Sequence, residues 1–276
     1  MIAHEFKIFD AHLHSYGLFL DSNKNIIEYL DAHNVEKAII TTINRAAKIS
    51  PQMDDIDTNQ LKTYKMIPKG QLNHDDVIEI CNQAPKRFYP FFWFNPNIDS
   101  QNEEESYKIL EEHFKKGFCG IKLQPSINLI KIPRDVLKLI DFMQEYNKEY
   151  PIFIHLSPKF SFFSGTSIKD FSILATKYPD LTIILGHAAL SMELAIDIGL
   201  NLKKYKNIIF ETSCSIPLGI LSLIRNVGHK RLIFGSDAPT TNPLQLEIDK
   251  ILCLPISKIQ KEDIFYNNVY EFMNKF

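Results

Sequence analysis

The sequence predicts a single-domain α/β protein, a (β/α)8 or TIM barrel, and three observations support this prediction. Eight short runs rich in Ile, Val and Phe alternate with amphipathic segments along the chain. Such runs are typical of buried parallel strands, and their alternation with helices is typical of repeated βα units. The chain has 276 residues, close to the roughly 250 of such a barrel. We therefore expect residues 1–276 to form one domain.

The predicted elements follow one another as strand and helix. The strands are residues 7–14, 35–42, 87–95, 118–124, 151–156, 181–187, 207–213 and 231–236. The helices lie near residues 24–33, 73–84, 101–116, 133–149, 167–178, 190–205, 216–227 and 243–253. Asn242 before Pro243 predicts the start of the eighth helix, because Asn caps helices and Pro suits the first helical position. A ninth helix near residues 259–275 gives the barrel an additional C-terminal helix.

Two predicted connections are longer than a barrel needs. The segment from Asn44 to Leu72 is long enough to form a flap over the strand ends. The segment SPKFSFFSG after the fifth strand carries Phe160, Phe162 and Phe163, which are costly to expose unless they pack on the body or cover a ligand. We expect both segments to contact the substrate.

Composition excludes several classes of partner. A formal net charge of -2 and a pI near 6.5 give no general attraction to nucleic acid or to anionic membranes. The four cysteines are scattered, without the spacing of a disulfide framework or a zinc knuckle. The segment MIAHEFKIFDAH lacks the basic stretch and apolar run that are typical of a signal peptide, and no apolar run approaches the roughly 18 residues of a membrane span. We expect a cytoplasmic protein with a small-molecule substrate, and a homo-oligomer is compatible with the sequence.

Metal-competent side chains end four of the predicted strands. His12 and His14 share the first strand, His155 ends the fifth, His187 ends the sixth and Asp237 follows the eighth. Residues two apart on a strand project to the same side, which in a barrel can be the interior. Active sites of these barrels lie at the carboxyl ends of the strands. The pattern predicts one metal-binding mouth, and with it a metal-dependent hydrolase or lyase.

Short segments distributed along the whole chain also carry a family resemblance. In order they are FDAHLH, PKRFYPFFWFNPN, GFCGIKLQP, IHLS, LGHA, FGSDAP and NNVYEF. Together they resemble the amidohydrolase superfamily, specifically its amidohydrolase-related branch of metal-dependent hydrolases and decarboxylases. The resemblance implies that the metal ligands are His12, His14, His155 and Asp237. It also implies that His187 acts beside the ion, and that Gln124 stands where GIKLHP members have a histidine.

The donor set suits a catalytic divalent metal. Imidazoles with one carboxylate favour Zn²⁺ and are acceptable to Mn²⁺. A zinc-bound water can have a pKa near 7, so hydroxide becomes available at neutral pH. On this hypothesis Asp237 both binds the metal and takes a proton from the water, while His187 polarises a carbonyl or protonates the leaving group.

Three further charged side chains lie near the predicted mouth. Asp10 should face the interior, where Lys122 or the N–H of a ligand imidazole could be its partner, and we expect it to support the site rather than to act in catalysis. Lys122 could hold a buried charge or contact an anionic substrate, although a carboxylated lysine bridges two metals in some superfamily members. We expect one metal. Arg45 could bind a substrate carboxylate or be a solvated charge, and Gln124 is a further candidate for substrate contact.

Three functions fit these residues. The first is hydrolysis of a carboxylic ester, lactone or amide. The alternative is non-oxidative decarboxylation of a small unsaturated or aromatic acid, for which Arg45, Lys122 and Lys159 could hold the anion. The third is a catalytically silent metal-binding barrel. The remaining histidines are not predicted ligands, and His74 is expected to face solvent.

Overall fold

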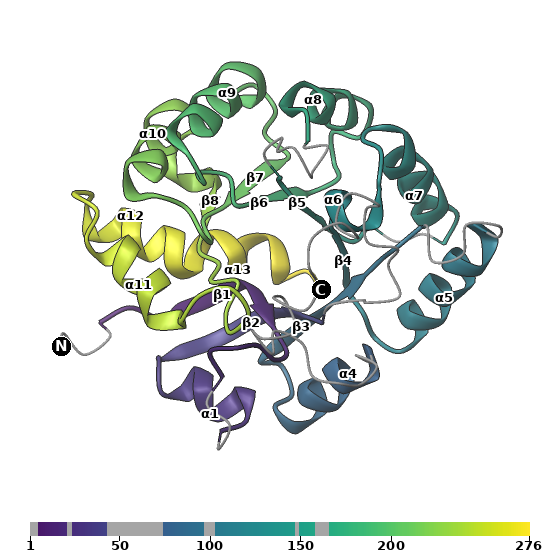
Figure 1. The fold of residues 1–276 in the computed structure, drawn as a ribbon, viewed down its shortest axis with the longest axis horizontal. Helices are drawn as coiled ribbons and strands as arrows, with labels where there is room; N and C mark the ends of the chain where they lie inside the picture. The colour runs from purple at the N-terminus through teal and green to yellow at the C-terminus, as the bar shows by residue number, and fades with distance from the viewer. Residues whose placement is uncertain (1–4, 21–23, 43–73, 97–102, 147–148, 158–165) are drawn as a thin grey trace, which may run out of the picture.

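Eight parallel strands form one sheet whose spatial order is that of the chain, with helices around it (Figure 1). The structure is a computed structural model that describes residues 5–20, 24–42, 74–96, 103–146, 149–157 and 166–276. The predicted (β/α)8 TIM barrel is confirmed. The predicted flap with Arg45 and the Phe-rich segment with Lys159 lie outside the described residues.

Each predicted strand is present, and most are shorter than expected. They are β1 (Ile8–His14), β2 (Val35–Thr41), β3 (Phe88–Trp93), β4 (Gly120–Leu123), β5 (Ile152–His155), β6 (Ile183–Gly186), β7 (Ile208–Glu211) and β8 (Leu232–Ile233). Nearly all of their residues are buried, because the outer helices cover the strands and side chains fill the barrel. Burial on both sides explains why the strand sequences are continuously apolar and do not alternate with polar residues.

The described helices match the predicted ones with two differences. They are α1 (Ile26–Asp31), α4 (His74–Gln83), α5 (Glu103–Lys115), α6 (Pro125–Asn128), α7 (Arg134–Glu145), α8 (Ile168–Lys177), α9 (Met192–Leu202), α10 (Pro217–Val227), α11 (Leu244–Leu252), α12 (Lys258–Glu262) and α13 (Asn268–Met273). The short helix α6 was not predicted. The predicted start of α11 was wrong by one residue: Pro243 is its cap, and the Asn242 amide instead donates to Glu247 Oε1 at 2.8 Å. No described helix is both long and apolar enough to cross a membrane.

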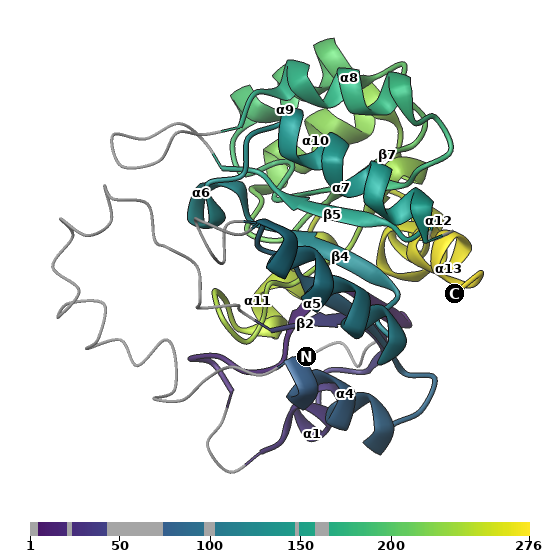
Figure 2. The ribbon, with the colours of Figure 1, turned by 90° about the vertical axis from the view of Figure 1, so that its right-hand side faces the viewer.

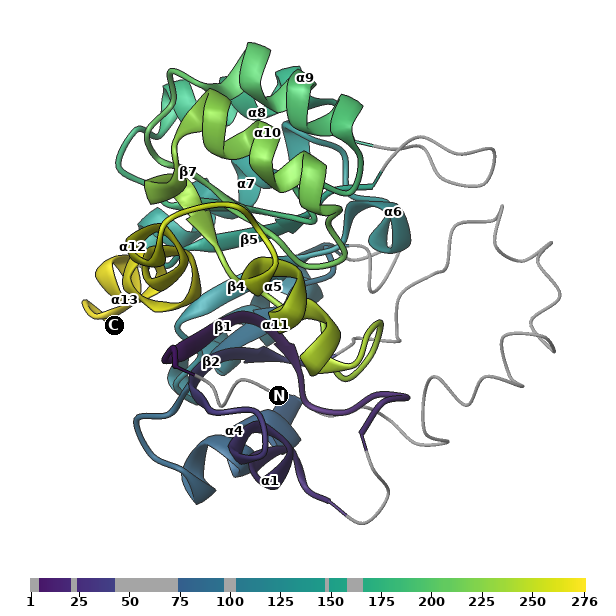
Figure 3. The ribbon, with the colours of Figure 1, turned by 90° about the vertical axis from the view of Figure 1, so that its left-hand side faces the viewer.

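The predicted C-terminal helix closes one end of the barrel. It forms as α12, a π-helical turn at Asp263–Asn267, and α13. Val269 and Met273 of α13 join the core inside the barrel, together with Phe9, Ala11, Ile39, Phe91, Phe153, Ile184 and Ile233. Figures 2 and 3 show α12 and α13 at the end opposite α6. Because α6 follows the carboxyl end of β4, α12 and α13 cover the amino ends of the strands. The end of the barrel at the carboxyl ends is therefore the one left open for a catalytic site.

Hydrogen bonds between β1 and the residues that follow β8 close the barrel. The Ala11 N–H donates to the Phe234 carbonyl at 2.9 Å, and the Asp237 N–H donates to the His12 carbonyl at 2.7 Å. The second bond joins the backbones of two predicted metal ligands directly. Closure of the barrel therefore fixes Asp237 beside His12.

The Asp10 side chain joins β1 to the segment after β8 at this seam. Its Oδ1 accepts the backbone N–H groups of His12 and Ser236 at 2.9 and 3.0 Å, and its Oδ2 accepts the Ser236 hydroxyl at 2.5 Å. The β1–β2 register shifts between Asp10 and Leu13. Burial raises the pKa of Asp10 to about 7. The expected pairing of Asp10 with Lys122 or an imidazole was wrong, because the backbone N–H groups of His12 and Ser236 and the Ser236 hydroxyl bind its oxygens instead.

Candidate metal centre

The predicted strand-end residues meet in one cluster at the carboxyl mouth of the barrel. His12, His187 and Asp237 each offer a ligand atom, and these atoms lie within 4.8 Å of one another. His14 Nε2 lies 2.9 Å from Asp237 Oδ1. His155 Nδ1 lies 2.9 Å from His187 Nε2. His155 is partly exposed and the other four side chains are buried, so residues remote in the sequence converge on one site.

The tightest group differs from the ligand set that the resemblance implies. His187 is part of it, while His14 and His155 adjoin it through Asp237 and His187 respectively. Imidazole nitrogens and a carboxylate suit a divalent transition metal in either combination. The described residues therefore fit such an ion, and His12 and Asp237 belong to both sets. The assignment of His14 and His155 as ligands stays a prediction.

Sequence reasoning missed Glu211, the last residue of β7. It is fully buried, and its Oε2 lies 3.4 Å from His12 Nδ1. The same oxygen accepts the His187 backbone N–H at 3.1 Å and the Ser213 hydroxyl at 2.8 Å. A Cβ at Gly235 would collide with this carboxylate, so only glycine leaves room for it there. An acid that ends an apolar strand run is the same signal that marked the histidines.

Glu211 and Ser213 fix which ring nitrogens carry protons. A hydroxyl has one hydrogen, and that of Ser213 goes to Glu211, so Ser213 Oγ accepts from His12 Nδ1 at 3.1 Å and His187 Nδ1 at 3.0 Å. Both rings thus carry hydrogen on Nδ1 and present Nε2 lone pairs to the site. His155 Nδ1 must then donate to His187 Nε2. Outer contacts of this kind hold metal-binding imidazoles in one tautomer.

Burial separates the charges in the cluster into neutral imidazoles and ionised carboxylates. Burial lowers the pKa of His12 to about 3 and also lowers the pKa of His187. For Asp237, burial opposes ionisation, yet His12 and His14 hold its pKa well below its usual range. For Glu211, hydrogen bonding to His12 likewise overcomes burial and lowers the pKa to about 2. Lone pairs and negative charge at one buried point are what a cation requires.

Lys122 reaches into this cluster from β4. Its Nζ lies 2.8 Å from His12 Nε2 and 3.7 Å from the centre of the Phe153 ring. Burial lowers the pKa of Lys122 to about 7. Lys122 lies at the mouth, as predicted. The side chain that it contacts is His12 and not Asp10.

Gln124, at the start of α6, is also buried near the end of β4. Its Oε1 has no hydrogen-bond partner within the described part of the chain, and the same holds for His14 Nδ1. Buried polar atoms without partners are uncommon in folded proteins and call for a ligand, water or ion. These two atoms are therefore candidates for contact with a bound molecule.

Three residues at consecutive strand ends have an unusual backbone conformation. His187, Cys214 and Asp237 have φ values of 60°, 54° and 54°. The left-handed region is uncommon for residues other than glycine, and such strain concentrates at functional sites. The Cys214 thiol lies 3.7 Å from Asp237 Oδ2. The chain thus adopts a left-handed conformation just after each of β6, β7 and β8.

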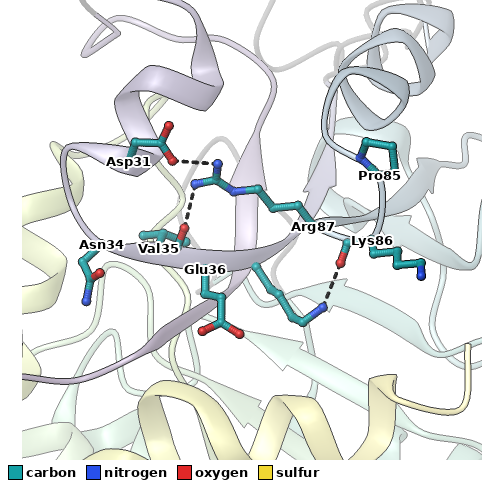
Figure 4. A pocket seen from close by; sticks show the side chains of 8 residues that line it. Asp31, Asn34, Val35, Glu36, Pro85, Lys86 and Arg87 are labelled. Carbon is teal, nitrogen blue, oxygen red and sulfur yellow. Dashed lines mark hydrogen bonds and ion pairs between the residues drawn. The ribbon is translucent and has the colours of Figure 1, made fainter.

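A surface pocket at the other end of the barrel does not resemble a catalytic site (Figure 4). The pocket lies where β2 and β3 begin. The Arg87 guanidinium that lines it is already paired, with Asp31 at 2.7 Å and with the Val35 carbonyl at 2.8 Å. The Lys37 ammonium donates to the Lys86 carbonyl at 2.8 Å. These contacts stabilise the strand starts.

A second group of buried histidines lies between α4 and α5. The His74 ring centre is 4.2 Å from that of Phe92 and 5.2 Å from that of His113. The expectation that His74 faces solvent was wrong, since its side chain is only 7% exposed. The packing of α4 on β3 covers it, which the sequence near its helix start did not indicate.

The fold and the cluster define a TIM barrel with a metal-competent mouth, and the chain belongs to the amidohydrolase family. The model of that family matches residues 21–272. No curated protein sequence matches the chain significantly.

Several solved structures share the fold at low sequence identity. A dihydroxybenzoic acid decarboxylase from a Polaromonas species, with bound manganese and the inhibitor 2-nitroresorcinol, is 16% identical with a TM-score of 0.62, covering 98% of this chain and 96% of that one. A 5-carboxyvanillate decarboxylase from Sphingomonas paucimobilis is 14% identical with a TM-score of 0.65, covering 98% and 99%. A probable 2-pyrone-4,6-dicarboxylic acid hydrolase from Acinetobacter baumannii, with citric acid bound, is 14% identical with a TM-score of 0.60, covering 97% and 99%. At these identities the likeness establishes the fold.

Proposed function

We propose that this chain is a divalent-metal-dependent decarboxylase of a small aromatic or unsaturated acid, formed by one domain over residues 1–276. The observation that carries the proposal is the buried Lys122 amine beside His12, at the same mouth as His187. A buried amine can bind a carboxylate substrate, whereas attack by hydroxide does not need one. Two of the similar structures described above are decarboxylases of aromatic acids, which supports the same class.

The reaction needs one proton and no oxidant. An aryl carboxylate plus a proton gives the arene and CO2; the carbon–carbon electron pair stays with the ring and forms the new C–H bond. His187 is neutral, and its Nε2 accepts from His155 Nδ1. In the reaction this nitrogen would exchange His155 for a substrate hydroxyl, take its proton and return it to the ring carbon, and the phenolate left behind would take the one net proton from water. A bound divalent ion would supply a fixed positive charge for the carboxylate or phenolate oxygen.

We propose that His12, His14, His155 and Asp237 hold one such ion, with zinc as the first candidate and manganese as the second. The manganese in the Polaromonas decarboxylase supports a divalent ion of this size in this fold. Elemental analysis of the purified protein should find about one metal per chain, as expected for a single four-donor site. Two metals per chain would instead favour a bridging role for Lys122.

Substrate contacts follow from the same mouth. We propose that Lys122 and Gln124 line the substrate position, since Gln124 Oε1 lacks a partner among the described residues. Arg45 stays a predicted carboxylate-binding residue. We also propose a cytoplasmic location, which the four free cysteines support.

Hydrolysis of a lactone or ester is the second candidate. Asp237 could accept a proton from water, and the similar pyrone dicarboxylic acid hydrolase acts by its name as a hydrolase. We rank it second because the buried Lys122 amine offers a contact for a substrate carboxylate, which attack by hydroxide does not need.

The deciding experiment incubates the metal-loaded protein with hydroxybenzoic acids, 5-carboxyvanillate and pyrone dicarboxylates. Release of CO2 with formation of the matching phenol, reduced in Asp237→Asn and His187→Asn, would support decarboxylation. Ring opening of the lactone without CO2 release would support hydrolysis. Equal, negligible turnover by all three proteins with metal retained would favour the catalytically silent barrel.

A further inference from the structure

A buried ion pair on α11 faces the segment that follows β7. Glu247 and Lys250 lie one turn apart on this helix and contact each other, and their side chains are only 3% and 9% exposed. Burying an ion pair costs desolvation free energy, which is offset only where further hydrogen bonds satisfy both charges. The described hydrogen bonds of this pair lead to the backbone of the segment after β7.

The pair holds the backbone on both sides of Ser213. The Lys250 ammonium donates to the Thr212 carbonyl at 2.9 Å, and Glu247 Oε2 accepts the Cys214 backbone N–H at 3.3 Å. Cys214 has a φ of 54°, in the left-handed region that residues with a side chain seldom adopt. The carboxylate thus secures the N–H group of a strained residue, and Ser213 lies between two backbone groups that α11 holds.

The Ser213 hydroxyl sets the tautomer of two histidines at the mouth. Its Oγ lies 3.1 Å from His12 Nδ1 and 3.0 Å from His187 Nδ1, and it donates to Glu211 Oε2 at 2.8 Å. Three hydrogen bonds at one small side chain tolerate little displacement, because each weakens outside a narrow range of distance and angle. If the hydroxyl moved, either ring could carry its hydrogen on Nε2 instead, and that nitrogen would lose its lone pair.

We propose that Glu247 and Lys250 are positioning residues that hold the Ser213 hydroxyl in place from α11. Through that hydroxyl they keep the rings of His12 and His187 in the tautomer that presents Nε2 to the mouth. An ion pair that only anchored α11 would affect stability and leave these rings unchanged. The positioning role concerns the geometry of the metal centre, so it holds for decarboxylation and hydrolysis alike.

Competition between the full-length chain and a chelator for zinc tests the proposal. Lys250→Met keeps the length of the side chain but removes its donor, and should weaken zinc binding by about tenfold, as loss of an outer contact of metal-binding histidines does. The matched control is Asp263→Asn at the other end of the barrel, because Asp263 is also buried and contacts a lysine, Lys230 at 2.8 Å. Both variants should lower the melting temperature, but the control should keep zinc affinity within about twofold of wild type.

Ser213→Ala shows whether the ion pair acts through the hydroxyl. This variant alone should weaken zinc binding by about 10- to 100-fold. Adding Lys250→Met to it should change the affinity by less than about twofold, because two residues that act through one contact are not additive. Nitrogen NMR of the full-length chain treated with chelator then distinguishes the protonated from the unprotonated ring nitrogens. Wild type should carry hydrogen on Nδ1 of His12 and His187, and Lys250→Met should show a mixture of tautomers.

Three results would each overturn the proposal: zinc affinity and tautomers unchanged in Lys250→Met, an equal loss of affinity in Asp263→Asn, or a further tenfold loss when Lys250→Met is added to Ser213→Ala. If Lys250→Met does not fold, Glu247→Gln takes its place in every comparison, since an amide offers one acceptor oxygen where the carboxylate offers two. If wild type binds no zinc, the metal centre itself is wrong, and the ring tautomers still decide the positioning role.

Discussion

Two groups of buried histidines can be compared in this barrel, one at the carboxyl mouth and one between α4 and α5. Burial lowers the pKa of His12 in the first group and of His74 in the second, each to about 3. At the mouth, Asp237 and Glu211 lie within 3.4 Å of the His12 ring. Between α4 and α5, His74 and its neighbour His113 pack on the rings of Phe92 and Phe118.

The difference shows what distinguishes a site from a core. A lowered histidine pKa arises from desolvation in both places and says nothing about function by itself. Of these two groups, the one at the mouth brings ionised carboxylates and imidazole lone pairs together, with strained backbone at three strand ends. The α4–α5 pair is a packing element that happens to contain imidazoles.

The largest effect should come from Asp237. We expect Asp237→Asn to lower kcat by about 10³-fold or more, because it removes the one carboxylate in the tightest donor group. His113→Asn, in the other histidine group, should leave kcat within about twofold. Steady-state turnover of the two variants measures this, and a similar loss in both would erase the distinction between the groups.

His187→Asn comes next. Loss of a proton-transferring group should lower kcat by about 10²- to 10⁴-fold while the bound metal is retained. Elemental analysis must accompany the kinetics, because His187 also lies in the tightest donor group. If the variant loses its metal, His187 is a ligand, and the assignment of His14 or His155 must change.

Glu211→Gln should have a smaller and different effect. The glutamine amide keeps the shape of the side chain but removes its negative charge. That charge strengthens the hydrogen bond from the Ser213 hydroxyl and stabilises the His12 tautomer. We expect metal affinity to fall by about 10- to 100-fold, as for other outer contacts of metal-binding histidines. Competition with a chelator measures it, and an unchanged affinity would make Glu211 a purely structural acid.

His74 gives the smallest effect, which concerns stability alone. Its folded pKa is about 3 against 6.5 for the free side chain, so below pH 6.5 the unfolded state binds the proton first. Stability should therefore fall as pH falls through this window, by at most about 1.4 kcal/mol per pH unit. His74→Phe should remove this contribution.

Urea unfolding of the metal-loaded wild type and the His74→Phe variant at pH 7 and pH 5 measures the contribution of His74 to the pH dependence of stability. The difference between the proteins should widen by about 1–2 kcal/mol at the lower pH. Turnover should stay unchanged in both. A difference independent of pH would mean that His74 is already protonated or exposed in the folded protein.

The sequence determined the barrel and most of its mouth. Eight apolar runs predicted eight strands because a strand covered by helices on one side and by packed side chains on the other must be apolar throughout. His12, His14, His155, His187 and Asp237 were recognised because the carboxyl ends of parallel strands meet at one end of a barrel. Glu211 carried the same signal and was missed, because it lay inside the predicted strand 207–213, whereas the strand of the structure ends at this residue.

Only the tertiary structure decided the contacts among these residues. Asp10 binds the backbone N–H groups of His12 and Ser236 rather than Lys122, beside a shift in the β1–β2 register, and no sequence pattern marks where a ladder breaks. His74 is buried because α4 packs on β3. The residues that mark the start of a helix do not show which of its faces will pack on the sheet. The tautomers of His12 and His187 depend on one hydroxyl hydrogen, that of Ser213 in the segment after β7. Local sequence fixes which groups reach the mouth, whereas barrel closure fixes which of them touch.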